Sequence, residues 1–177
     1  MHLSQFMLSE SLAADVYGVH RRLHEFFPQT PDEKRTCLYR VEPEKSMDSF
    51  PVLVVSDELP KRKADPHMFL VGTLNFDPKC FQEGEVLSFR CLANASITKK
   101  GKRHPVIGED ALMEWLTRKL EGAAVLKNAW ISKTFVRKFL SRGNNSVIAN
   151  EILFEGVLEV TNQEHFAGIL KKGIGKT

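Results

Sequence analysis

The fold class is decided by residues 1–27, which read MHLSQFMLSESLAADVYGVHRRLHEFF and change their hydrophobic period part of the way along. Between residues 2 and 8 polar and apolar side chains alternate, and this pattern predicts a β-strand. From Leu12 onward the apolar residues recur at helical spacing; they are Leu12, Val16, Val19, Leu23, Phe26 and Phe27. At about 100° per residue they form one stripe, so we expect an amphipathic helix, capped by Ser9 or Ser11, that runs to about Phe27.

One flank of this predicted helix carries three rings, those of Tyr17, His20 and His24. Side chains three or four residues apart are neighbours on a helix surface, so these rings can converge on one bound group. An imidazole with an ordinary pKa of about 6.5 can transfer protons near neutral pH. A single histidine beside an apolar stripe is also commonly a packed or surface residue. The spacing alone leaves both interpretations open.

The composition is that of a globular protein with 177 residues, 42% of them hydrophobic and 27% charged. No apolar stretch reaches the roughly 18 to 20 residues that cross a bilayer, so we expect no membrane partner. Three cysteines without paired spacing argue against a disulfide framework or a zinc site and favour a cytoplasmic protein. No His/Glu cluster has metal-ligand spacing, and we therefore expect neither a metal nor another cofactor.

Positive charge is concentrated in the middle of the chain. Residues 99–142 carry 11 basic and 4 acidic side chains, whereas residues 1–98 carry 11 basic and 14 acidic ones. A basic region between mildly acidic flanks indicates a surface that binds a polyanion. The alternative is a solvated, lysine-rich face.

The order of the expected elements predicts an α+β protein with two tandem ferredoxin-like (βαββαβ) domains. Further strands are expected at 36–41, 50–55, 69–75, 86–97, 129–140 and 147–160, and further helices at 109–121 and from residue 161 or 162 to 170. We place the boundary between residues 1–95 and 96–177. The second domain lacks its closing strand in this chain.

A basic turn and a predicted hairpin carry the basic residues that we assign to nucleic-acid binding. The first is the turn KKGKRH at residues 99–104, and the second surrounds the loop SRGNN at residues 141–145. A basic β-ribbon can follow a nucleic-acid backbone, and it can equally be an exposed hairpin kept soluble by its charge. The assigned residues are Lys99, Lys100, Lys102, Arg103, Lys133, Arg137, Lys138 and Arg142.

The terminal GIGKT is not a P-loop, because Leu170 stands where that motif requires its first glycine. A glycine-rich turn near lysines still lets backbone N–H groups approach phosphate, so we assign Lys172, Gly173 and Gly175 to phosphate binding as well. The alternative for this segment is a charged tail.

Several motifs in a fixed order resemble the CasE family of CRISPR-associated, repeat-processing endoribonucleases, which belongs to the RAMP superfamily. The N-terminal MHLS and the helix residues 15–20 (DVYGVH), followed by Leu23 and Phe27-Pro28, are similar to the family's first strand and catalytic helix. The later motifs are FRCLAN at 89–94, Val106 with Trp115-Leu116 and Lys119-Leu120, FEGVL at 154–158 and GIG at 173–175.

The resemblance implies a metal-independent endonuclease that cuts the repeat hairpin of a CRISPR precursor transcript by 2′-OH attack. It further implies that His20 transfers a proton and that Tyr17 orients the ribose or the scissile phosphate. The products would carry a 2′,3′-cyclic phosphate and a 5′-OH. The basic and glycine residues assigned above would bind the RNA hairpin. The enzyme would retain the mature crRNA as a subunit of the type I-E complex Cascade.

The chain departs from the family where the glycine-rich loop leads into a closing strand, because it ends at Lys176-Thr177. This departure keeps a second interpretation open, a non-catalytic RNA-binding or assembly subunit of the same fold. A third is a ferredoxin-like regulatory domain without an RNA role.

Overall fold

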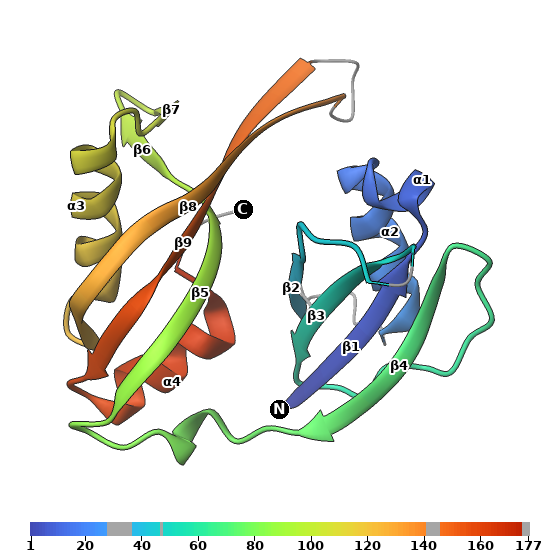
Figure 1. Ribbon diagram of the computed structural model, residues 1–177, viewed down its shortest axis with the longest axis horizontal. Helices are drawn as coiled ribbons and strands as arrows, with labels where there is room; N and C mark the ends of the chain where they lie inside the picture. Colours follow the sequence, from blue (N-terminus) through green and yellow to red (C-terminus); the bar gives the residue numbers. More distant parts are fainter. Residues whose placement is uncertain (28–36, 47, 141–145, 175–177) are drawn as a thin grey trace. The chain divides into compact units, whose positions relative to one another are not determined.

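The computed structural model describes residues 1–27, 37–46, 48–140 and 146–174 of the chain (Figure 1). The chain divides into two compact units, Met1–Asp77 and Pro78–Thr177. Each unit combines helices with an antiparallel sheet, which confirms the expected mixture of the two. In the part of the chain that is described, no helix is long and apolar enough to cross a membrane.

The first unit is built on a four-stranded sheet with the strand order β2-β3-β1-β4. Strand β1 pairs antiparallel with both β3 and β4, so it is one of the two inner strands although it comes first in the chain. All four strands fall where the alternation of polar and apolar residues predicts them. Their bounds are His2–Leu8 for β1, Cys37–Val41 for β2, Phe50–Ser56 for β3 and Met68–Asn75 for β4.

The single helix expected from Ser9 to Phe27 is wrong, because the chain forms two helices, α1 (Glu10–Ala13) and α2 (Val16–Phe26). Ser9 caps the first, as expected. Asp15 leaves the helical conformation, with φ −103° and ψ 88°, and its Oδ1 accepts a hydrogen bond of 2.9 Å from the Gly18 amide. A short carboxylate that caps a helix start competes with the continuation of the preceding turn, so α2 begins one residue before Tyr17.

The apolar stripe of α2 packs on the sheet. Val19, Leu23 and Phe26 are at most 1% exposed and share one core with buried residues of β1 and β3. The Phe26 ring meets the Phe6 ring edge-on, with 5.2 Å between the centroids. Each such side chain contributes about 1.5–3 kcal/mol when it is fully buried, so this face holds α2 firmly on the sheet.

The second unit contains a three-stranded sheet with the order β5-β9-β8. Strand β5 pairs with β9 along its whole length, from Val86↔Glu159 to Asn94↔Glu151, so it belongs to this unit. The boundary that we expected after residue 95 would have placed β5 in the first domain. The elements are the 3-10 helix η1 (Pro78–Cys80), β5 (Val86–Asn94), α3 (Glu109–Leu120), β8 (Ala124–Leu140), β9 (Ser146–Val160) and α4 (Gln163–Lys172).

Two strands of this unit differ in length from the expected ones. The strand predicted over 86–97 ends at Asn94, and after the buried Ala95 a separate strand β6 (Ser96–Lys99) forms a two-stranded hairpin with β7 (Lys102–Pro105). Strand β8 begins at Ala124 instead of residue 129. In the described part of the sheet, the pairing of β8 with β9 continues beyond the last residue of β5, so these two strands extend past the end of β5 (Figure 1).

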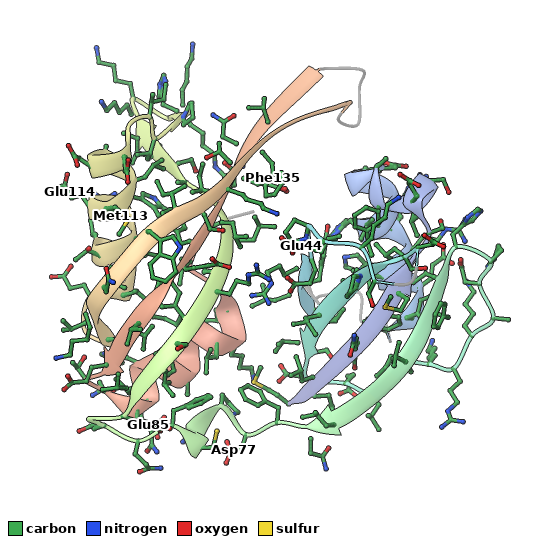
Figure 2. The ribbon with its side chains drawn as sticks, viewed as in Figure 1. Glu44, Asp77, Glu85, Met113, Glu114 and Phe135 are labelled. Atoms are coloured by element: carbon green, nitrogen blue, oxygen red, sulfur yellow. The ribbon has the colours of Figure 1, made fainter. Side chains whose placement is uncertain are left out.

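Helices α3 and α4 contribute to one hydrophobic core with this sheet. Trp115 of α3 is 2% exposed and stacks on Phe154 of β9, with 6.2 Å between ring centroids and 17° between the planes. The indole Nε1–H donates to the Ser96 carbonyl oxygen at 3.2 Å and so ties α3 to β6. The exposed Glu114 lies on the opposite side of α3 and points to solvent (Figure 2).

Candidate functional site

The three rings predicted on one flank of the N-terminal helix do lie together on α2. The centroids of Tyr17 and His20 are 6.5 Å apart, and those of His20 and His24 are 4.3 Å apart with an interplanar angle of 78°. His20 is exposed, whereas Tyr17 and His24 are half-buried. Since the apolar stripe fixes α2 on the sheet, this flank presents an accessible imidazole between two partly covered rings.

A fourth ring comes from the sheet. Tyr39 of β2 lies 6.3 Å from His20 between centroids, and it packs at the edge of the core below α2. The sequence interpretation missed this residue. Its signal was the period of two in residues 37–41, because Cys37, Tyr39 and Val41 all contact the core on the helix side.

Positive charge lies beside the rings. The Arg21 guanidinium carbon is 5.3 Å from the centre of the Tyr17 ring, within the range of a cation–π contact. A guanidinium on the same helical turn as an exposed imidazole suits the binding of an anion. Together, the phenols, the imidazoles and this cation can bind a negatively charged group and move a proton at it.

Among the described residues, no group of three or more His, Cys, Asp or Glu side chains is arranged to hold a metal ion.

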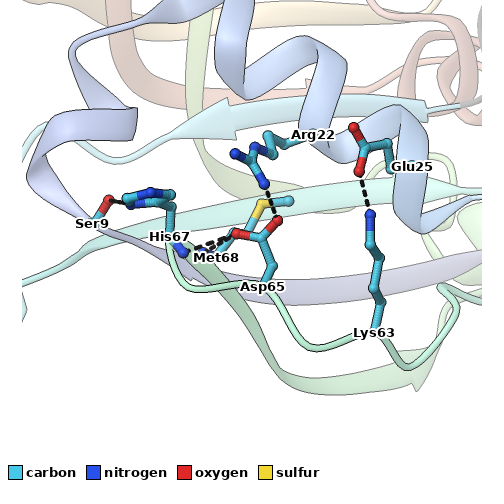
Figure 3. A network of polar contacts seen from close by, with 7 residues as sticks. All are labelled: Ser9, Arg22, Glu25, Lys63, Asp65, His67 and Met68. Carbon is cyan, nitrogen blue, oxygen red and sulfur yellow. Dashed lines mark hydrogen bonds and ion pairs between the residues drawn. The ribbon is translucent and has the colours of Figure 1, made fainter.

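The side of α2 away from the rings is tied to the chain between β3 and β4 (Figure 3). The Arg22 guanidinium forms an ion pair with Asp65, and Glu25 pairs with Lys63. The hydrogen bond and charge of Lys63 lower the pKa of Glu25 below its ordinary value. Burial alone would raise the pKa of Asp65, but hydrogen bonds from the His67 amide and from Arg22 outweigh it and lower that pKa. Asp65 is thus a carboxylate at neutral pH.

The predicted RNA-binding residues belong to the second unit. Lys99, Lys100, Lys102 and Arg103 are all exposed, and they lie together on the β6–β7 hairpin, whose turn is made by Lys100 and Gly101 with positive φ. Basic side chains extend from this hairpin into solvent (Figure 2). The structure thus gathers the first predicted group on one short ribbon.

The second predicted group follows β8. Lys133 is exposed, and Arg137 and Lys138 lie opposite Ala149 and Ile148 in the β8–β9 hairpin. Lys172 is exposed at the last position of α4, and Gly173 ends the helix with φ 75°. Arg142 and Gly175 lie outside the described residues.

Comparison with known sequences gives the chain a family and two relatives. The family model described as CRISPR associated protein matches residues 1–177. The chain is 28% identical to the CRISPR system Cascade subunit CasE of Escherichia coli (strain K12), with 99% of this chain and 92% of that protein covered. It is 29% identical to the CRISPR-associated endoribonuclease Cse3 of Thermus thermophilus, over 92% of this chain and 84% of the relative.

Comparison with solved structures gives the same picture for the fold. The CRISPR-associated protein Cas6e from Escherichia coli K-12 matches with a TM-score of 0.74 and 25% identity, over 100% of this chain and 93% of that chain. The endoribonuclease Cse3 bound to a 19-nucleotide RNA matches with a TM-score of 0.86 and 24% identity, over 100% and 94%. At such identity the second match concerns the fold alone.

Proposed function

Because the chain belongs to the family of CRISPR-associated proteins, we propose that it is an endoribonuclease that cuts CRISPR precursor transcripts at the hairpin of the repeat. The relatives that match nearly end to end are a Cascade subunit and a CRISPR-associated endoribonuclease. The structural observation that supports the proposal is the ring cluster on α2, where an exposed His20 lies beside Tyr17.

The reaction that suits this cluster is an internal phosphoryl transfer. The ribose 2′-oxygen attacks the adjacent phosphorus and loses its proton, the bond from phosphorus to the 5′-oxygen breaks, and that oxygen gains a proton. The products are a 2′,3′-cyclic phosphate and a 5′-OH, and no external nucleophile is consumed. His20 transfers one of these protons, and Tyr17 orients the ribose or the scissile phosphate. Arg21 next to Tyr17 adds charge that stabilises the negative phosphorane-like transition state.

The basic residues of the second unit hold the RNA. The exposed Lys99, Lys100, Lys102 and Arg103 on the β6–β7 hairpin support contacts to the phosphate backbone. Further contacts come from β8, from the residues that follow it and from the glycines after α4; they involve Lys133, Arg137, Lys138, Arg142, Lys172, Gly173 and Gly175. The separation of chemistry and grip between two units predicts that each can be altered without the other.

We describe the architecture as two tandem ferredoxin-like domains. The order β2-β3-β1-β4 of the first sheet supports this, because a βαββαβ chain gives the same order. In the second unit β5, β9 and β8 correspond to three of the four strands of that pattern. We place the change of domain after Asp77, in line with the pairing of β5.

After cleavage the protein keeps the mature crRNA and assembles with the other subunits of a type I-E Cascade, in the cytoplasm. The name of the Escherichia coli relative, a Cascade subunit, supports this role.

The experiment that tests the proposal is incubation of the purified protein with an RNA of the repeat from the CRISPR array of the same genome, in buffer with EDTA. We expect one cut at the hairpin, with a 2′,3′-cyclic phosphate on the upstream fragment and a 5′-OH on the downstream one. Binding of the hairpin without cleavage would instead indicate the non-catalytic RNA-binding subunit. A requirement for added Mg²⁺ would contradict the metal-independent chemistry.

A further inference from the structure

The segment between β3 and β4, residues 57–67, is fastened to α2 and its neighbour at four successive points. The Lys61 amide donates to the Phe26 carbonyl oxygen at 2.6 Å, and the Ser9 amide donates to the His67 carbonyl oxygen at 2.9 Å. Between these ends come the pairs of Lys63 with Glu25 and of Asp65 with Arg22 (Figure 3). In place of regular secondary structure, this segment makes a line of contacts along the helix that carries His20.

Asp65 is the most constrained member of this line. Its side chain is 1% exposed, and three donors meet its two oxygens. Oδ1 accepts from the amides of His67 at 2.8 Å and Met68 at 3.1 Å, and Oδ2 receives the Arg22 guanidinium. The two backbone bonds fix the carboxylate to the start of β4, so Arg22 is held by a group that cannot follow it if α2 turns.

Arg22 and the rings lie on the same helix, so the contact of Arg22 with Asp65 affects where the rings are held. Arg22 follows His20 by two residues, which is about 200° around the helix, so the two side chains leave α2 on opposite sides. The apolar stripe holds α2 on one side, and on another side Arg22 pairs with the buried Asp65 carboxylate, so the two contacts together oppose rotation of the helix about its axis. Rotation is the motion that would displace His20 and Tyr17 together.

We propose that Asp65 is a positioning residue for cleavage: through Arg22 it sets the rotation of α2 and thereby the place of His20 relative to the scissile phosphate. This inference rests on the proposed function. Displacement of a catalytic group by about 1 Å can cost about 100-fold in rate. Loss of the contact between Asp65 and Arg22 should therefore slow the chemical step.

The test compares Asp65→Asn with Arg22→Gln and with the double variant, on the repeat hairpin RNA in EDTA. Asn keeps the shape of Asp65 but loses its charge, and Arg22→Gln removes the partner at a side chain that is 36% exposed. We expect the single-turnover cleavage rate to fall about 10- to 100-fold in each single variant, while the dissociation constant of the RNA changes less than about threefold. Because both residues act through one contact, the double variant should be no slower than the slower single variant.

Lys63→Gln is the matched control, since Lys63 pairs with the same helix from the same segment but at the surface, with 43% of its side chain exposed. Exposed ion pairs contribute little, so this variant should cleave like the wild type. Circular dichroism at the assay temperature establishes that every variant is folded before rates are compared.

Three results would overturn the inference: Asp65→Asn cleaving at the wild-type rate, losses that multiply in the double variant, or a fall in RNA binding as large as the fall in rate. The proposed function fails separately, when the wild type itself leaves the RNA intact in EDTA. A slow Asp65→Asn beside an active wild type and an active Lys63→Gln supports both.

Discussion

At the scale of single residues, the His20 imidazole lies within 6.5 Å, centroid to centroid, of the rings of Tyr17, His24 and Tyr39. Three of these four side chains come from α2 and one from β2. An exposed side chain keeps several rotamers unless its neighbours restrict them, and neighbouring rings reduce that freedom. The orientation of His20 is therefore set by two elements together.

We expect Tyr39→Ala to lower the cleavage rate about tenfold and Tyr39→Phe to change it less than about threefold. Alanine removes the ring beside His20, whereas phenylalanine keeps the ring and loses only the hydroxyl. Single-turnover assays on the repeat hairpin measure both. Wild-type cleavage by Tyr39→Ala would show that the ring does not orient His20, and a large loss in Tyr39→Phe would transfer the role to the hydroxyl.

Spacing along one helix predicts some of the ring contacts around His20 but not the contact that comes from the sheet. Tyr17, His20 and His24 could be predicted as neighbours because they lie within two turns of one helix. Tyr39 could not be paired with His20, because their contact depends on how β2 packs against α2. The helix break at Asp15 was missed for a related reason: Ser9, Ser11 and Asp15 are all good caps, and only the packed structure selects Ser9 and Asp15.

At the scale of elements, a βαββαβ unit would have a helix between β3 and β4. Here a charged segment takes its place and forms ion pairs with α2. The prolines and charges of residues 57–66 are typical of a loop or a short broken helix, and the structure has a loop there. Its attachment to α2 could not be predicted, since the partners Arg22 and Asp65 are 43 residues apart and meet only in the folded sheet.

The Asp65 anchor predicts that stability depends on pH. Its pKa is lowered in the folded protein, so its stabilising effect is complete above the ordinary carboxyl pKa of about 3.9 and is lost as the pH falls through the lower, folded value. Urea unfolding from pH 6 to pH 3 should show a falling free energy of unfolding for the wild type and a flatter profile for Asp65→Asn. Parallel profiles for the two proteins would contradict this assignment.

The centre of β9 predicts a strong effect of a small substitution. A Cβ built on Gly156 would lie 2.2 Å from the Asn128 carbonyl oxygen and 2.7 Å from the Ala129 Cα, where the β8 register shifts. Both atoms are backbone, so the strands must move apart. We expect Gly156→Ala to lower the free energy of unfolding by about 1–3 kcal/mol. Gly72→Ala, with nothing within 4 Å of the added carbon, is the control; equal stabilities would contradict the close approach.

At the scale of the whole molecule, chemistry and RNA grip are assigned to different units. The order of the elements predicts two units because each repeats a strand–helix–strand–strand pattern. Strand β5 follows β4 closely in the chain but pairs with β9, more than 50 residues later, and the order of elements along the chain does not reveal this pairing. The cleavage reaction is implied by the family resemblance and could not be predicted from the spacing of residues.

This division predicts how binding responds to salt. Replacement of Lys99, Lys100, Lys102 and Arg103 by glutamine should weaken hairpin binding and flatten its salt dependence between about 50 and 200 mM, by about 0.7–0.9 in log–log slope for each lost phosphate contact. The single-turnover rate at saturating protein should stay within about threefold of the wild type. Lys45→Gln with Lys63→Gln removes two exposed, ion-paired lysines of the first unit and serves as the control. An unchanged slope in the fourfold variant would contradict the assigned grip.

The measurement that tests the central claim most directly is the single-turnover cleavage of the repeat hairpin by His20→Ala in EDTA, with RNA binding measured on the same sample. His20 is exposed and its replacement leaves the core of α2 intact, so the variant should fold and bind RNA within about threefold of the wild type. The account predicts a fall in the cleavage rate of about 10²- to 10⁴-fold, the range of general acid–base catalysis. Cleavage within about threefold of the wild-type rate would contradict it.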